Sequence, residues 1–277
     1  MMMCIPLYWC ACSGTPILLQ WRESIMPMNT PAASGNDSRL YVYALAGIGT
    51  APGFMQEFHG ELSRRLAAST GFTAAGGLLY PYGEWSRSVR RQIWEVWRDI
   101  RLPAGAWARS YGVAAVRREL EPAARGSGPV VLVGHSGGGT AAVHAADMLL
   151  AADPERPVAV VQIGSPRSPV PPVLQEATVY CYACGPDGRG RDPVCRLGSW
   201  RAAGEPRGRL PVGRAVWRKP GQLVPLPIAG RHPDYFRGHL RAAGGASNLE
   251  LALETVEKHI QGLWPQLFGE EERAPFS

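Results

Sequence analysis

Lysine is almost absent from this chain: Lys219 and Lys258 are the only lysines among the 29 basic residues of its 277 positions. Arginine therefore supplies nearly all of the formal charge of +6, and the arginines are spread from Arg22 to Arg273. Nucleic-acid-binding proteins usually gather their charge into a patch or a tail. We interpret the arginines as the compositional bias of a GC-rich genome and expect no nucleic-acid partner.

Long apolar runs are also lacking. After the first 21 positions no run of 18 or more uncharged apolar residues occurs, which excludes a multi-span membrane protein. The apolar start, Met1–Leu19, contains no Lys or Arg, unlike a secretory signal, and is interrupted by proline and glycine. We interpret residues 1–38 as a disordered or mis-annotated N-terminal extension, with translation beginning near Met26 or Met28.

We expect residues 39–277 to form the folded domain. We expect a cytoplasmic protein, with secretion as the alternative if the apolar segment is a genuine signal, and no stable membrane insertion. Nothing in the sequence indicates the oligomeric state.

Cysteine is too sparse for a disulfide scaffold, since the whole chain has six. Cys181 and Cys184 form one C-x-x-C, but a zinc site normally needs a second ligand pair at a regular spacing. The flanking residues are typical of a buried strand, in which cysteine behaves as a small hydrophobe. We therefore expect no metal and no organic cofactor.

Strand-like and helix-like segments alternate along the chain. Apolar runs rich in β-formers predict buried strands at 40–45, 77–80, 129–134, 157–163, 178–184, 215–217 and 223–228. Helical spacing predicts helices at 54–66, 89–100, 111–124, 141–152 and 247–263. This alternation is typical of an α/β fold with a mostly parallel central sheet and helices on both faces.

The strongest motif is Gly134-His135-Ser136-Gly137-Gly138, which fits G-x-S-x-G. It follows the clearest buried strand and precedes a helix, the context that a nucleophile elbow requires. The sharp turn forces the serine into a strained backbone conformation, so the positions two residues away must lack side chains. The motif therefore predicts a catalytic serine at the carboxyl end of the strand.

A serine nucleophile needs a histidine base that a carboxylate orients, in the chain order Ser, Asp or Glu, His. His232 follows the last predicted strand on a loop from which it can reach Ser136, and His239 is the fallback. Asp187 and Asp192 both follow the strand at 178–184, and spacing alone leaves them nearly equal.

Four elements together resemble the class 3 lipase family, the fungal-lipase-like branch of the α/β-hydrolases. They are the elbow at 134–138, the Gly-Ser-Pro-Arg at 164–167, the Asp-Pro-Val-Cys-Arg-Leu at 192–197 and the His-Pro-Asp-Tyr at 232–235. The resemblance implies an α/β-hydrolase fold and favours Asp192 over Asp187 as the acid. The chain departs from the family at Ile48, where an arginine usually precedes the Gly-Thr pair.

The resemblance implies a serine hydrolase of the lipase or esterase type, cleaving carboxylic esters through an acyl-enzyme on Ser136. The catalytic residues are then Ser136, Asp192 and His232, and the substrate is a small-molecule ester or a lipid. The oxyanion hole would use the N–H of Gly137 and a donor after the first strand, for which the family points to Thr50 and loop position also allows Ile48.

Two alternatives remain open: an acyl-thioesterase with the same triad, and a non-catalytic binding protein. The tryptophans bear on the substrate. On the helical pattern of 89–100, Trp94 and Trp97 are expected to include core positions. Trp85 and Trp107 lie in predicted loops, where they could line an acyl pocket or a mobile cap.

Overall fold

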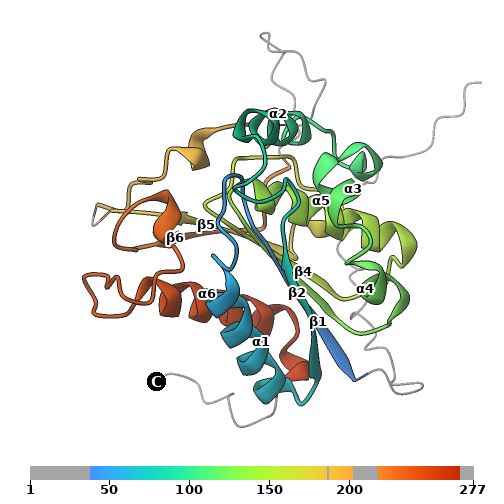
Figure 1. Ribbon diagram of the computed structural model, residues 1–277. Helices are drawn as coiled ribbons and strands as arrows, with labels where there is room; N and C mark the ends of the chain where they lie inside the picture. The colour runs from blue at the N-terminus through green and yellow to red at the C-terminus, as the bar shows by residue number, and fades with distance from the viewer. Residues whose placement is uncertain (1–37, 186, 202–217, 269–277) are drawn as a thin grey trace, which may run out of the picture. The chain divides into compact units, whose positions relative to one another are not determined.

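The structure is a computed structural model that describes residues 38–185, 187–201 and 218–268 (Figure 1). The strand predicted at 215–217 and residues 1–37 of the predicted extension lie outside the described residues. The strands are β1 Arg39–Leu45, β2 Thr73–Leu79, β3 Val130–His135, β4 Val158–Ile163, β5 Thr178–Ala183 and β6 Gln222–Leu226. The α-helices are α1 Gln56–Thr70, α2 Val89–Asp99, α3 Tyr111–Val116, α4 Glu121–Arg125, α5 Gly137–Ala152 and α6 Asn248–Leu263.

The strands form one six-stranded sheet in the order β2-β1-β3-β4-β5-β6, and every pairing is parallel. Each residue of β3 and β4 is buried. This accounts for their continuous apolar runs, because a parallel sheet covered on both faces leaves no polar side. The α/β fold predicted from the sequence, with a mostly parallel central sheet and helices on both faces, is confirmed.

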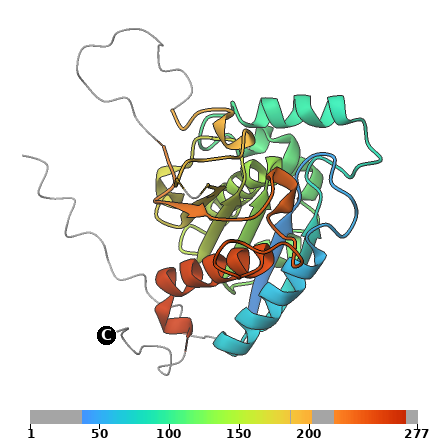
Figure 2. The ribbon, with the colours of Figure 1, turned by 90° about the vertical axis from the view of Figure 1, so that its left-hand side faces the viewer.

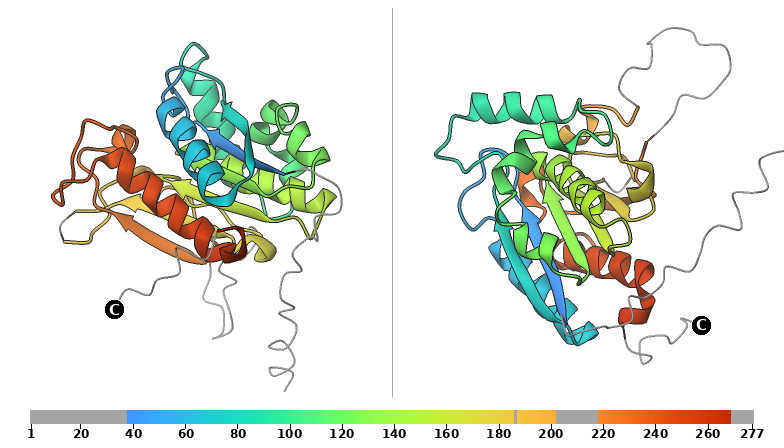
Figure 3. Two further views of the ribbon diagram at one scale, coloured as in Figure 1. Left: turned by 90° about the horizontal axis from the view of Figure 1, so that it is seen from below. Right: turned by 90° about the vertical axis from the view of Figure 1, so that its right-hand side faces the viewer.

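The two faces of the sheet carry separate apolar cores. Side chains alternate between the faces along each strand, so Val42 packs toward α1 and α6 while Tyr41 and Tyr43 pack toward α3, α4 and α5. Figures 1 and 3 show α1 and α6 together on one side of the sheet and α5 on the other. None of the helices among the described residues has the length and apolar content to cross a bilayer.

Strand β2 begins four residues earlier than the sequence predicts, at Thr73 rather than Gly77. Its sequence, rich in alanine and glycine, has low β-propensity, but all seven residues pair with β1. A Cβ at Gly76 would lie 2.0 Å from the carbonyl oxygen of Val42, so the close approach of the strands needs glycine there. Pairing with a neighbour thus overrides the local preference.

Helix α2 differs more seriously from the prediction. Trp94 and Trp97 were expected to include core positions, and this is wrong: they are 48% and 41% exposed. The polar residues Gln92, Glu95 and Asp99 are buried in their place.

Candidate active site

Ser136 lies in a tight turn between β3 and α5. Its φ of 54° and ψ of −131° make it the one non-glycine residue with positive φ among those the structure describes. A Cβ at Gly134 would lie 2.3 Å from the carbonyl oxygen of Gly138, and a Cβ at Gly138 would lie 2.0 Å from that of Leu45. The two glycines of the motif are therefore required sterically. Such strain is uncommon outside functional sites.

The structure brings Asp192 and His232 together. Nδ1 of His232 lies 2.7 Å from Oδ2 of Asp192, across 40 residues of sequence. The Asp192 side chain is fully buried, whereas that of His232 is 23% exposed. The acid of this pair is thus sealed in the protein, while the imidazole keeps access to solvent.

Asp192 is held as a carboxylate by three donors. Oδ2 also accepts from the hydroxyl of Tyr235 at 2.9 Å, and Oδ1 accepts from the N–H of Val194 at 2.9 Å. Burial alone would raise the pKa of the Asp192 carboxyl, but the interactions with His232, Tyr235 and Val194 outweigh it, so the pKa is lowered. The buried acid therefore stays negative at neutral pH.

The loop that carries His232 is fixed from two sides. The Tyr235 hydroxyl accepts from the N–H of Ala183 at the end of β5 while it donates to Asp192. Asn248, fully buried at the start of α6, accepts from the N–H of Ala229 and donates to the carbonyl oxygens of Ala229 and Asp234. The sequence analysis missed Asn248, because an asparagine at a helix start is common and the contact depends on the folded loop.

His135, the residue before Ser136, connects the serine turn to the Asp192–His232 pair. Its ring stacks on that of His232, with centroids 4.8 Å apart and an interplanar angle of 26°. Its Nε2 lies 3.1 Å from the carbonyl oxygen of His232, to which it donates. Burial, and then the nearby charge of His232, lower the pKa of His135 to about 3. His135 is thus a neutral ring against which the imidazole of His232 rests.

The loop after β1 lies against the serine. A Cβ at Gly47 would be 2.6 Å from Cβ of Ser136 and 3.1 Å from its Oγ. The Thr50 hydroxyl donates to the carbonyl oxygen of Gly47 at 3.0 Å, and the N–H of Gly49 donates to Gln92. Gly137 is the first residue of α5, so its N–H has no partner inside the helix. These contacts do not discriminate between Ile48 and Thr50 as the second donor of an oxyanion hole.

The alternative residues lie apart. His239 is exposed. Asp187 is exposed, and its carboxylate accepts from the N–H of Arg189 in a turn. Cys181, Cys184 and Cys195 are buried free thiols, and burial raises the pKa of the Cys181 thiol to about 12. Within the described ranges no group of three His, Cys, Asp or Glu side chains is arranged to hold a metal ion.

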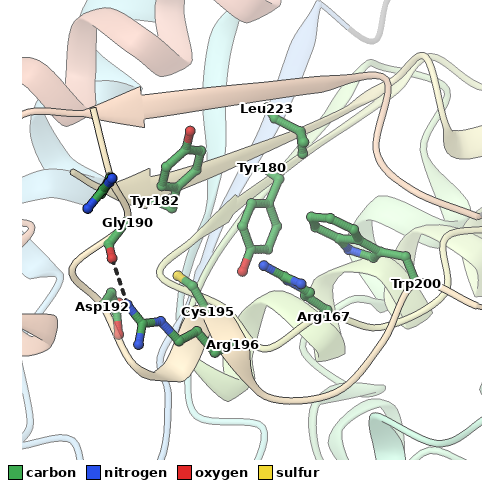
Figure 4. A pocket seen from close by; sticks show the side chains of 10 residues that line it. Arg167, Tyr180, Tyr182, Gly190, Asp192, Cys195, Arg196, Trp200 and Leu223 are labelled. Carbon is green, nitrogen blue, oxygen red and sulfur yellow. Dashed lines mark hydrogen bonds between the residues drawn. The ribbon is translucent and has the colours of Figure 1, made fainter. Parts of the chain in front are cut away.

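A cavity of about 480 Å³ lies behind the acid (Figure 4). Arginine and aromatic side chains line it, and the guanidinium of Arg167 lies 4.8 Å from the ring centroid of Trp200. Asp192 contributes to its wall, but neither Ser136 nor His232 does. It therefore lies apart from the serine and is not where a scissile bond would sit.

No protein-family profile and no curated protein matches this chain. Among solved structures, one described with LipS and LipT, two metagenome-derived lipolytic enzymes, is 16% identical; the match covers 82% of this chain and 95% of that one, with a TM-score of 0.40. The RedJ thioesterase of the prodiginine biosynthetic pathway in Streptomyces coelicolor is 15% identical, over 91% and 97% of the two chains, with a TM-score of 0.39. The lin2722 gene product of Listeria innocua is 13% identical, over 53% and 70%, with a TM-score of 0.30. These comparisons do not confirm the class 3 lipase family, and the residues of this chain carry the functional argument.

Proposed function

We propose that this protein is a serine hydrolase that cleaves carboxylic esters through an acyl-enzyme on Ser136. The observation that carries the proposal is the pairing of His232 with the buried Asp192 at 2.7 Å, next to a serine with strained backbone. A structural ion pair would not need the adjoining turn to hold a serine in a sparsely populated conformation.

In this mechanism His232 takes the proton of Ser136 as the hydroxyl oxygen attacks the ester carbonyl. Asp192 fixes the tautomer with Nδ1 protonated, which leaves Nε2 as the base, and stabilises the imidazolium that forms. The imidazolium then gives its proton to the departing alcohol. Water, activated by the same histidine, hydrolyses the acyl-enzyme and regenerates the serine.

The tetrahedral intermediate carries a negative oxygen that needs preorganised donors. The N–H of Gly137 at the start of α5 is one, where the helix dipole adds a partial positive charge. The loop after β1 supplies the other through Ile48 or Thr50. Loss of one such donor typically costs about 3–4 kcal/mol of transition-state stabilisation.

A fluorophosphonate probe tests the nucleophile. We expect the wild-type protein and Ser69→Ala to be labelled equally, since Ser69 is an exposed serine of α1. Ser136→Ala should take up no probe. Undiminished labelling of Ser136→Ala would overturn the proposal.

Substrate assays separate an esterase from a thioesterase. Matched p-nitrophenyl esters and acyl-thioesters of short and long acyl chains should be compared at equal concentration. Preference for the oxygen esters is expected, and a higher kcat/KM for the thioesters would favour the alternative with the same triad.

A further inference from the structure

Helix α2 buries three polar side chains beside the apolar Val96. Gln92 and Asp99 are fully buried and Glu95 is 4% exposed, at the spacing of one helical face. Buried polar groups are costly unless they are hydrogen-bonded. The orientation of α2 is therefore determined by the partners of these three side chains.

Asp99 has four donors, all from chain segments beside α2. They are the hydroxyl of Tyr82 at 2.9 Å, the hydroxyl of Ser110 at 2.7 Å, and the N–H groups of Tyr111 and Gly112 at 3.0 and 2.9 Å. A carboxylate with this many donors fixes the C-terminal end of the helix to the start of α3.

The N-terminal half is fixed in the same way. Gln92 accepts from the N–H of Gly49 at 2.8 Å and donates to the carbonyl oxygens of Glu84 and Arg87. Glu95 forms a bidentate ion pair with Arg87, both contacts at 2.6 Å. With both ends held, α2 cannot rotate to bury its other side without leaving these groups unpaired.

The outward side carries exposed apolar side chains among its arginines. Among the described residues, six of the nine exposed large hydrophobic side chains belong to it or adjoin it. We call this surface the α2 face; it comprises Trp85, Val89, Ile93, Trp94, Trp97 and Tyr111. Figure 2 shows α2 at the periphery of the domain, away from α1 and α6. Grouped exposed hydrophobic residues of this kind indicate an interaction surface.

Arginine predominates among the charges around the α2 face, although Glu84 adjoins Trp85 and Glu95 pairs with Arg87 and Arg91. Residues 85–111 contain six arginines, and their two carboxylates, Glu95 and Asp99, are both buried. The guanidinium groups of Arg98 and Arg101 lie 5.4 and 4.1 Å from the ring centroids of Trp94 and Trp97. The exposed surface is thus a set of tryptophans and aliphatic side chains with cations beside them.

We propose that the α2 face docks this protein onto an anionic lipid surface. Tryptophan and arginine both suit the boundary between acyl chains and headgroups, because each combines an apolar body with a polar end. Arginines attract anionic headgroups while Ile93 and the tryptophans enter the acyl boundary. A second copy of the chain fits less well, because a two-fold pairing of this face would set its arginines against one another.

Docking there would bring the lipid surface to the elbow. A Cβ at Gly137 would lie 2.8 Å from the side chain of Val96, so α2 packs directly against the turn that carries Ser136. The α2 face would then deliver esters held in that surface. This last step rests on the proposed hydrolase function, whereas docking itself does not.

Vesicle co-sedimentation tests docking independently of catalysis. The full-length chain with Ser136→Ala is mixed with vesicles of phosphatidylcholine alone or with about 30% phosphatidylglycerol, at low and at high salt. We expect strong binding to the anionic vesicles at low salt only, since salt screens the headgroup charge.

Matched variants identify the surface. Ile93→Ser should weaken partitioning about tenfold, whereas Val173→Ser, another exposed aliphatic residue, should leave it unchanged. Arg98→Gln with Arg101→Gln should weaken it roughly 30-fold. Arg117→Gln with Arg118→Gln, two exposed arginines outside the α2 face, should have much less effect. Thermal melting confirms that each variant is folded.

Three results would overturn the inference. One is equal binding of the wild-type surface to neutral and anionic vesicles. Another is an equal loss of binding in the α2 variants and their controls. The third is a dimer in analytical ultracentrifugation that Ile93→Ser dissociates, which would make the α2 face a contact between copies. A protein that binds anionic vesicles but has no esterase activity would contradict the proposed function and not this inference. A protein with esterase activity that does not bind anionic vesicles would contradict this inference and not the proposed function.

Discussion

Replacing Asp192 with asparagine isolates the contribution of one negative charge at the proposed active site. The amide has nearly the volume of the carboxylate, so packing is preserved. Both carboxylate oxygens accept hydrogen bonds, two at Oδ2 and one at Oδ1. The amide of asparagine can be placed with its nitrogen at either oxygen position. In both placements the nitrogen faces a hydrogen-bond donor, so at least one hydrogen bond is lost.

The two orientations bracket the expected effect. With the amide nitrogen toward Val194, the oxygen still accepts from Nδ1 of His232, and only the charge that stabilises the imidazolium is lost. With the nitrogen toward His232, the ring adopts the wrong tautomer and Nε2 no longer acts as a base. We expect turnover to fall by about 10²- to 10⁴-fold, the upper value being the serine-protease precedent, which corresponds to about 3–5 kcal/mol in the barrier.

Two control substitutions separate chemistry from stability. Asp187→Asn changes an exposed turn residue and should alter turnover by less than about twofold. Asp99→Asn removes a buried charge with four donors that lies outside the proposed triad, and should cost about 1–3 kcal/mol of stability. Its effect on turnover should remain below about tenfold. Initial rates with a soluble p-nitrophenyl ester and urea unfolding curves are measured for all three variants.

A catalytic role for the Asp192 charge is excluded if Asp192→Asn lowers turnover no more than Asp99→Asn does. If Asp187→Asn lowers turnover strongly instead, Asp187 is the acid and lies directly after β5.

Two further predictions follow from close packing and from burial. Gly47→Ala should lower kcat at least about 100-fold, because its Cβ would lie 2.6 Å from Cβ of Ser136. The control Gly60→Ala, in open space on α1, should leave kcat unchanged and raise stability by up to about 1 kcal/mol. Equal kcat values for the two variants would contradict this prediction. Burial lowers the pKa of His144 to about 4. The folded state therefore holds His144 neutral, and this contribution to stability is complete above pH 6.5. It is lost as the pH falls from 6.5 toward 4, because in that range the unfolded chain binds the proton and the folded chain does not. His144→Gln should therefore remove up to about 1.4 kcal/mol per pH unit from the acid slope of unfolding free energy, measured by urea titration between pH 7 and 4.5; an unchanged slope would exclude His144 as its source.

Local sequence was sufficient to predict the central strands of the sheet and the tight turn at Ser136. The buried runs of β3 and β4 have an apolar residue at almost every position, which only a doubly covered sheet permits. The elbow motif is local too, because its two glycines meet a steric requirement within five residues of chain.

The arrangement of α2 could not be predicted in the same way. Helical spacing shows that Ile93 and Trp97 share a face, but not that the opposite face is the buried one. That depends on whether Gln92 and Asp99 find donors and acceptors, and their partners come from segments up to 43 residues away. The stacking of His135 on His232 was missed for the same reason, since 97 residues separate the two.

Asn248 forms hydrogen bonds to Ala229 and Asp234, on either side of His232. The position of His232 therefore does not depend on the conformation of residues 237–246. That loop leaves the site after the fully buried Tyr235 and returns at the first turn of α6. Its residues 242–246 form a turn that is closed by their own backbone bonds and exposed at 243–245. We expect insertions or deletions in this turn to leave the imidazole in place, since Asn248 of the helix holds the segment that carries it. The loop is therefore a place where a lineage, or an engineer, could vary the surroundings of the histidine while its position stays constant.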